Sequence, residues 1–289
     1  MSLFTVRHIT VYRYSHPVEL GEHRMIFRPR ESHDLRLLKS SLRIVPHPTR
    51  VRWLHDAFDN SVAVVTFDGA TSELCFDSAV TLEHFETMLP EYPLEEYAKT
   101  YPFSYSDEEL PNLALAIVNQ YPSENVKHWV SQFLDPSGRT GTMHLLRAMT
   151  LGIRQEFIYV PRSEKDVQRP DETLQMRRGS CRDFAVLMME ATRSLGLAAR
   201  FVSGYIFVPG MDAGGTKGGG STHAWMQTYL PGAGWIDFDP TNSIIGNRNL
   251  IRVAVAWDSK QVLPLWGTFV GSASSFLGMD VTVTVTEDG

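Results

Sequence analysis

The residue best suited to covalent chemistry is Cys181, which stands at the expected start of an amphipathic helix. Apolar residues follow it at the spacing that places them on one helical face: Phe184, Leu187, Met188, Ala191 and Leu195. Ser180 and Asp183 have the pattern of a capping box, which would make Cys181 the first helical residue. Unpaired amides and the positive end of the helix dipole favour thiolate over thiol there. On this helix alone, a small buried residue filling a core gap explains the cysteine equally well.

Two later residues could complete a catalytic triad with this cysteine. His223 lies in Thr222-His-Ala-Trp225, and Asp239 lies in Phe238-Asp-Pro-Thr-Asn242. In such a triad the thiolate attacks an acyl carbon, the imidazole takes and returns the proton, and the carboxylate orients the imidazole. Each residue has an ordinary alternative, because His223 could be a hydrogen-bonded core residue and Asp239 could simply begin a turn. Asp237 shares a strand face with Asp239, since side chains repeat every two residues.

A zinc site is the competing interpretation of the same three residues, because thiolate, imidazole and carboxylate all bind zinc. The sequence offers no fourth ligand beside them, and the six histidines before His84 lack the spacing of metal ligands. The glycine-rich segment 209–221, predicted to be a loop, lacks the Lys-Ser/Thr ending of a phosphate-binding loop. We therefore expect no metal and no cofactor.

Composition excludes several classes of protein. The chain has 289 residues, 43% hydrophobic and 21% charged, with a net charge of -6 and no basic run, so neither nucleic acid nor an anionic membrane is an expected partner. No apolar segment approaches the ~20 residues that span a bilayer, and the first residues lack a signal-peptide core, so we expect a cytoplasmic protein. Cys75 and Cys181 are the only cysteines, and a reducing compartment argues against a disulfide between them.

The amino-terminal part of the chain is rich in short strand patterns. Runs of β-branched and aromatic residues, separated by turn formers, predict strands over residues 3–14, 24–28, 41–45, 50–54, 61–67 and 73–82. Such spacing favours an antiparallel sandwich, and we assign residues 1–90 to a first domain. Residues 91–110, which have no clear period, are predicted to be a linker.

The remainder, residues 111–289, is predicted to be one α+β core with helices first and an antiparallel sheet afterwards. Apolar periodicity predicts helices over residues 113–119, 124–134 and 141–153 before the cysteine, and strands over 199–208, 222–230, 234–239, 251–256 and 281–286 after it. The turn Pro231-Gly-Ala-Gly234 predicts a hairpin. This hairpin would bring His223 and the two aspartates onto neighbouring strands.

Taken together, the three motifs resemble the bacterial transglutaminase-like family of the papain-like thiol enzyme superfamily. The motifs are Arg178-Gly-Ser-Cys-Arg-Asp-Phe-Ala185, Thr222-His-Ala-Trp225 and Phe238-Asp-Pro-Thr-Asn242. The similarity covers nearly all of residues 110–289. The amino-terminal part resembles the β-rich domain that precedes this core, through His8-Ile-Thr-Val-Tyr-Arg-Tyr14 and Asp56-Ala-Phe-Asp-Asn60. The resemblance implies a papain-like, transglutaminase-like core preceded by an all-β, sandwich-like domain.

By position, the resemblance makes Cys181 the nucleophile, His223 the general base and then acid, and Asp239 the orienting carboxylate, with Asp237 outside the triad. The tryptophan that helps to bind the oxyanion in animal-type transglutaminases has no match upstream of the cysteine. The Cys181 backbone amide is one candidate donor. Tyr159 is a second candidate, but a packed strand residue is the preferred interpretation of this tyrosine.

The implied function is a cysteine peptidase or amidase that works through an acyl-enzyme on a peptide or protein-amide substrate. The alternatives are transglutaminase-type acyl transfer to an amine and an inactive module that binds a peptide in the same groove. The same triad serves water and amine acceptors, so the motifs do not choose between them. Hydrolysis is preferred because the sequence carries no signature of a site for a free small-molecule acceptor.

Overall fold

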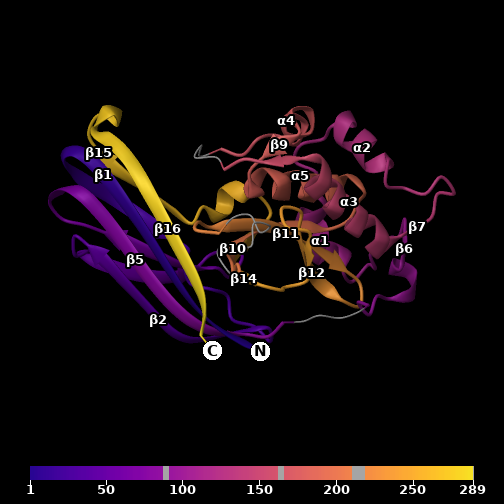
Figure 1. Ribbon diagram of the computed structural model, residues 1–289, viewed down its shortest axis with the longest axis horizontal. Helices are drawn as coiled ribbons and strands as arrows, with labels where there is room; N and C mark the ends of the chain where they lie inside the picture. The colour runs from indigo at the N-terminus through magenta and orange to yellow at the C-terminus, as the bar shows by residue number, and fades with distance from the viewer. Residues whose placement is uncertain (87–90, 162–165, 210–218, 289) are drawn as a thin grey trace.

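The computed structural model describes residues 1–86, 91–161, 166–209 and 219–288. Figure 1 shows a layer of long strands beside a compact part built of helices and a second sheet. This is the expected fold class, α+β with a β-rich amino-terminal part, and it is confirmed. The glycine-rich loop predicted over residues 209–221 lies mostly outside the described residues.

The first layer is a seven-stranded antiparallel sheet. Its main order is β2-β5-β1-β4-β3, and two strands from the carboxyl end, β15 and β16, also pair with β1. The strands are β1 (Ser2–Met25), β2 (Leu35–Val45), β3 (Arg50–His55), β4 (Ser61–Thr66), β5 (Ala70–His84), β15 (Leu265–Val270) and β16 (Phe276–Asp288). The predicted division placed residues 265–288 with the core, but their backbone bonds join them to β1. Sequence pattern identified 281–286 as a strand without indicating this distant partner.

The second sheet carries the expected hairpin and has the order β13-β12-β11-β10-β14. Its strands are β10 (Ala199–Ile206), β11 (His223–Leu230), β12 (Gly234–Asp239), β13 (Ile244–Ile245) and β14 (Leu250–Ala256). The helices are α1 (Leu110–Ile117), α2 (Glu124–Ser131), α3 (Thr142–Glu156), α4 (Pro170–Met176) and α5 (Cys181–Ser194). Helix α5 packs against β11 and β10, and its apolar stripe enters the main hydrophobic core.

Short elements complete the core. Two-residue strands form the pairs β6 (Thr100–Tyr101) with β7 (Thr140–Gly141), and β8 (Ile158–Tyr159) with β9 (Arg178–Gly179). Single 3-10 turns lie at Glu96–Ala98, Ser259–Val262 and Ala273–Ser275. The predicted linker thus contains a 3-10 turn and a strand, and its Glu95 amide donates to the Pro231 carbonyl. This part of the chain is fixed on the core by backbone bonds.

The large sheet and the core share one hydrophobic cluster. Phe4 and Val62 of the large sheet belong to the same buried cluster as Phe184 of α5. Across the contact, the Asn60 side chain bonds both the amide and the carbonyl of Val255, each at 2.9 Å. Because apolar burial and these hydrogen bonds act together, they hold the large sheet against the core. None of the described helices is long and apolar enough to cross a membrane.

Candidate active site

Cys181 occupies the first position of α5, as the capping box predicted. The Asp183 carboxylate accepts hydrogen bonds from the Ser180 amide (2.7 Å), the Ser180 hydroxyl (2.8 Å) and the Gln168 amide (2.7 Å). A Cβ at Gly179 would lie 2.9 Å from the Asp183 Cβ, so only glycine lets the chain pass this close to the cap. The cap therefore fixes the place of Cys181, a residue that is 7% exposed.

His223 and Asp239 meet as the hairpin predicted. His223 Nε2 lies 2.8 Å from Asp239 Oδ2, and both side chains are fully buried. Asp239 Oδ1 accepts a hydrogen bond from the Thr241 amide at 2.8 Å. Asp239 therefore both begins the Asp-Pro-Thr-Asn turn and contacts the histidine. The two interpretations of Asp239 are therefore compatible, because each uses a different carboxylate oxygen.

Asn242 is a member of this cluster to which sequence analysis assigned no role. Its Nδ2 donates to Asp239 Oδ2 at 2.8 Å and lies 3.5 Å from His223 Nε2. A side-chain amide that shares the oxygen used by histidine restricts rotation of the carboxylate. The only sequence signal was its place at the end of the Asp-Pro-Thr-Asn motif, where a turn explained it fully.

The imidazole of His223 carries a strongly shifted pKa. Burial lowers it, but the charge of Asp239, the hydrogen bond to Asp239 and the interaction with Cys181 together raise the pKa from 6.5 to about 10. Nδ1 is buried and has no hydrogen-bond partner of standard geometry among the described residues. Since Nε2 is held by Asp239, Nδ1 is the nitrogen left to exchange a proton with the Cys181 thiol.

This shift predicts a pH dependence of stability. Between about pH 6.5 and about pH 10 the folded chain holds a proton on His223 that the unfolded chain has lost, so the free energy of unfolding falls as pH rises. The slope from one proton is at most ~1.4 kcal/mol per pH unit. Urea unfolding at about pH 6, 8 and 10 should show this decrease in the free energy of unfolding in the wild type and not in His223→Gln. Equal slopes in both proteins would contradict the raised pKa.

Trp225 supports the imidazole from the same strand. Its ring stacks on His223 with centroids 5.9 Å apart and planes at 27°. The indole Nε1 donates to Asp237 Oδ1 at 2.6 Å, and Gln227 donates to the same oxygen at 2.9 Å. Burial raises the pKa of Asp237. Asp237 therefore holds the tryptophan rather than the histidine.

Tyr159, the candidate second oxyanion donor, is brought to the site by a short parallel pair. Strand β8 pairs with β9 so that Tyr159 lies opposite Gly179, two residues before Cys181. Burial raises the pKa of Tyr159 to about 12, with further contributions from the charges of Cys181 and Asp239. The Tyr159 phenol therefore interacts electrostatically with both Cys181 and Asp239. A protonated phenol can donate a hydrogen bond.

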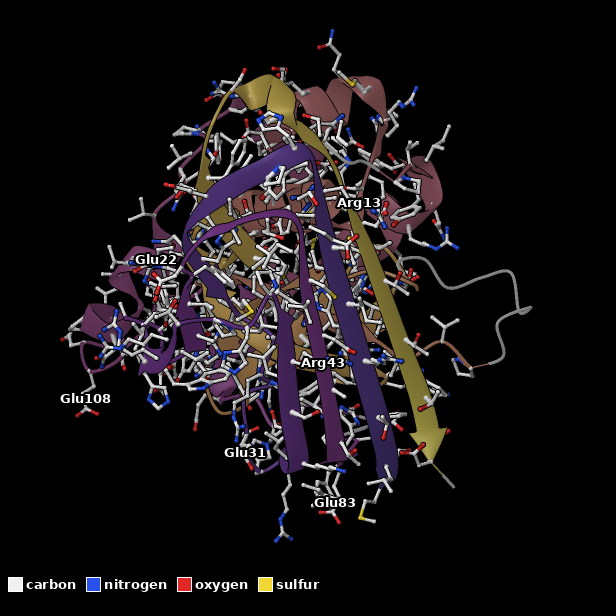
Figure 2. The ribbon with its side chains drawn as sticks, turned by 90° about the vertical axis from the view of Figure 1, so that its left-hand side faces the viewer. Arg13, Glu22, Glu31, Arg43, Glu83 and Glu108 are labelled. Atoms are coloured by element: carbon white, nitrogen blue, oxygen red, sulfur yellow. The ribbon has the colours of Figure 1, made fainter. Side chains whose placement is uncertain are left out.

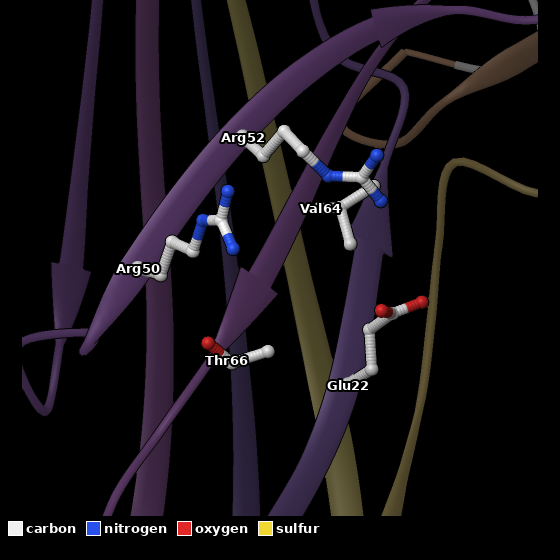
Figure 3. A pocket seen from close by; sticks show the side chains of 5 residues that line it. All are labelled: Glu22, Arg50, Arg52, Val64 and Thr66. Carbon is white, nitrogen blue, oxygen red and sulfur yellow. The ribbon is translucent and has the colours of Figure 1, made fainter.

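The other candidate sites lie apart from this cluster. Among the described residues, no three His, Cys, Asp or Glu side chains are arranged to hold a metal ion. Cys75 belongs to β5 of the large sheet and is a free thiol. A hollow of about 220 Å³ on the large sheet (Figure 3) is lined by Glu22, Arg50, Arg52, Val64 and Thr66, and none of the triad candidates reaches it.

Comparison with known families matches both parts of the chain. Residues 4–83 match the bacterial transglutaminase-like N-terminal region, and residues 130–240 match the transglutaminase-like superfamily. The second match contains the cysteine, histidine and aspartate described above. The two matches follow the same order as the large sheet and the core along the chain.

Individual proteins give the same pattern. An uncharacterised Mycobacterium tuberculosis protein is 28% identical over 97% of this chain and 92% of its own length. An uncharacterised Mycobacterium leprae protein is 35% identical over 45% of this chain, a match that spans only 46% of that protein. A solved structure from Cytophaga hutchinsonii, described as a candidate cysteine protease, superposes with a TM-score of 0.72 at 17% identity, covering 100% of this chain and 92% of that one. This last likeness concerns the fold.

Proposed function

The chain belongs to the transglutaminase-like superfamily, and on that basis we propose that it is a thiol-dependent hydrolase of amide or peptide bonds. Cys181 is the nucleophile, His223 the general base and acid, and Asp239 the residue that orients the imidazole. One observation carries the proposal: His223 is held by Asp239 through Nε2, while its other nitrogen, Nδ1, is left for the thiol at the helix start. A merely structural histidine would have its second nitrogen satisfied.

The reaction takes two balanced steps. The thiolate of Cys181 attacks the substrate carbonyl carbon, the carbon–sulfur bond forms, and the imidazolium gives its proton to the departing amine as the carbon–nitrogen bond breaks. Water then attacks the thioester, the imidazole takes its proton, and the acid leaves as the thiol is restored. The buried position of His223 and Asp239 strengthens each charge interaction in these steps.

The oxyanion that develops in each step needs donors. The Cys181 amide at the start of α5 is one, because the first amides of a helix have no intrahelical acceptor. The Tyr159 hydroxyl is the second, supported by the charge interaction of this phenol with Cys181. Its raised pKa keeps the phenol protonated at neutral pH, so it can donate.

Intact-mass analysis tests this function. The wild-type chain is incubated with a library of peptide and amide substrates, and we expect a transient acyl adduct that maps to Cys181. The adduct should decay to free acid in water. Addition of primary amines tests the alternative acceptor: an amine-dependent product would replace hydrolysis by acyl transfer at the same triad. Failure to form an adduct with any substrate would contradict the hydrolase and favour the peptide-binding module. The cytoplasmic location stays a prediction.

A further inference from the structure

The outer edge of β16 is a row of backbone groups beside the candidate active site. One side of β16 pairs with β1, from Leu3 opposite Asp288 to Tyr14 opposite Phe276. Within the residues that the structure describes, no strand pairs with the other side. Figure 2 shows β16 as the yellow outermost strand of this part of the sheet. An unpaired edge is a template for another extended chain.

A single bond identifies which groups face outward. The Val283 amide donates to the Gly220 carbonyl at 3.0 Å, so this amide points away from β1. Backbone direction alternates along an antiparallel strand, so Val281 and Val285 direct their amides and carbonyls to the same side. Among the described residues these two have no partner there. Within the part of the chain that the structure describes, the edge therefore has one position in use and a position without a partner on either side of it.

The occupied position links the edge to the catalytic histidine. Gly220 precedes His223 by three residues, and an extended residue spans at most ~3.6 Å, so the two lie within ~11 Å of each other. A strand laid on β16 next to Gly220 needs only a few residues to reach the imidazole. The edge and the triad are close enough to act on one extended chain.

Strands β15 and β16, which pair with successive parts of β1, also expose apolar side chains. Val270, Leu277 and Met279 are 68%, 65% and 47% exposed. Met279 shares its strand face with Val281 and with the buried Val283, the face that packs on the core. Leu277 and Met279 are two residues apart on β16, and exposed apolar residues beside an open edge are typical of a binding surface. An occupant with apolar side chains at alternate positions would cover them.

We propose that the β16 edge, meaning the outward backbone of Met279, Val281 and Val285, binds an extended segment of a polypeptide substrate as an added β-strand. This inference rests on the proposed function and names its substrate class: an unfolded or extended chain with apolar residues at alternate positions. Main-chain bonds supply the affinity, and the exposed side chains add a preference.

A second copy of this chain is a poorer occupant. Antiparallel pairing of two β16 edges would bring Asp280 of one copy, which is paired with Arg13, near the acidic end, Glu287 and Asp288, of the other. Like charges on adjacent strands disfavour such a pair. Charged residues on an edge are a common device against self-association. The acidic end of β16 therefore disfavours a second copy of this chain, and the middle of the strand can pair with a segment that is less acidic.

Substitution of proline at position 281 is the direct test. Proline removes the outward amide, and edge strands accept proline where the lost amide faces outward. Val281→Ala is the matched control, because it shortens the same side chain and keeps the amide. Both are made in Cys181→Ala, and fluorescence anisotropy measures binding of fluorescein-labelled, reduced and carboxymethylated lactalbumin. We expect ~10-fold weaker binding for Val281→Pro than for Val281→Ala, the upper range for one lost hydrogen bond.

Equal binding by the two folded variants, with matching thermal unfolding, would overturn the proposal. Sedimentation that reveals a dimer lost only in Val281→Pro, with lactalbumin binding unchanged, would assign the edge to a second copy and overturn it as well. Failure of the hydrolase function is separate, because binding is measured without the thiol. If the chain binds through the β16 edge and the wild type forms no acyl adduct on Cys181, the binding proposal is supported and the hydrolase proposal is contradicted.

Discussion

Cys181→Ala should lower kcat for amide substrates by ~10⁴-fold or more, the loss typical of removing a triad nucleophile. The reason is that no other described thiol lies beside His223, and water alone lacks the covalent route. Turnover is measured on the substrates that acylate the wild type, with His223 and Asp239 left in place. Circular dichroism and thermal unfolding of the variant show that its fold is retained.

Cys75→Ala is the matched control for this loss. Burial, then the charges of Asp77 and Glu73, raises the pKa of Cys75, so its thiol is protonated at neutral pH. We expect full turnover in Cys75→Ala, and iodoacetamide should label Cys181 faster than Cys75 well below pH 8. Turnover that survives Cys181→Ala, or that disappears in Cys75→Ala, would remove Cys181 from the role of nucleophile.

Glu190→Ala should give the largest loss of stability, ~3–5 kcal/mol, because it breaks an ion pair inside the core. Glu190 Oε1 lies 2.7 Å from Arg193 Nη1, and both side chains have no exposed surface. Glu190 Oε2 also accepts from the amides of Gln120 and Tyr121. Burial lowers the pKa of Arg193 and Glu190 opposes this, so removal of the carboxylate leaves a buried charge without its partner and the Gln120 amide without this acceptor, while the Tyr121 amide keeps Asn119 Oδ1 at 3.1 Å. Urea unfolding gives the free-energy difference.

Helix α2 offers an exposed ion pair as a control for charge removal. Glu124 pairs with Lys127 at 2.7 Å, with side chains 88% and 55% exposed, so Glu124→Ala should cost ~1 kcal/mol or less. Glu190→Gln keeps acceptors for the two amides and should fall between these values. If Glu190→Ala loses no more free energy of unfolding than Glu124→Ala, the buried ion pair does not stabilise α5.

Local patterns predicted the elements that carry the candidate site. The apolar stripe and the Ser180 and Asp183 cap set the start of α5 at Cys181, and the hairpin turn paired the strands of His223 and Asp239. These features depend on residues a few positions apart, so sequence spacing describes them well. The catalytic roles themselves stay predictions until turnover is measured.

Long-range features escaped the sequence because no local pattern specifies a distant partner. The Val/Thr alternation identified residues 281–286 as a strand, but only the folded chain decides that β16 pairs with β1 and leaves its other edge beside Gly220. The pairing of Tyr159 with Gly179 is also decided only in the folded chain.

By itself, then, the sequence determined that a cysteine at a helix start is followed by a histidine and an aspartate on paired strands. It also determined the α+β class, because periodicity and turn residues act over short distances. Only the tertiary structure decided that Asn242 shares the carboxylate of Asp239, that Trp225 stacks on His223, and that the carboxyl-terminal strand completes the first sheet. The physical reason is that these contacts depend on how whole elements pack, and many sequences with the same local patterns could pack them differently.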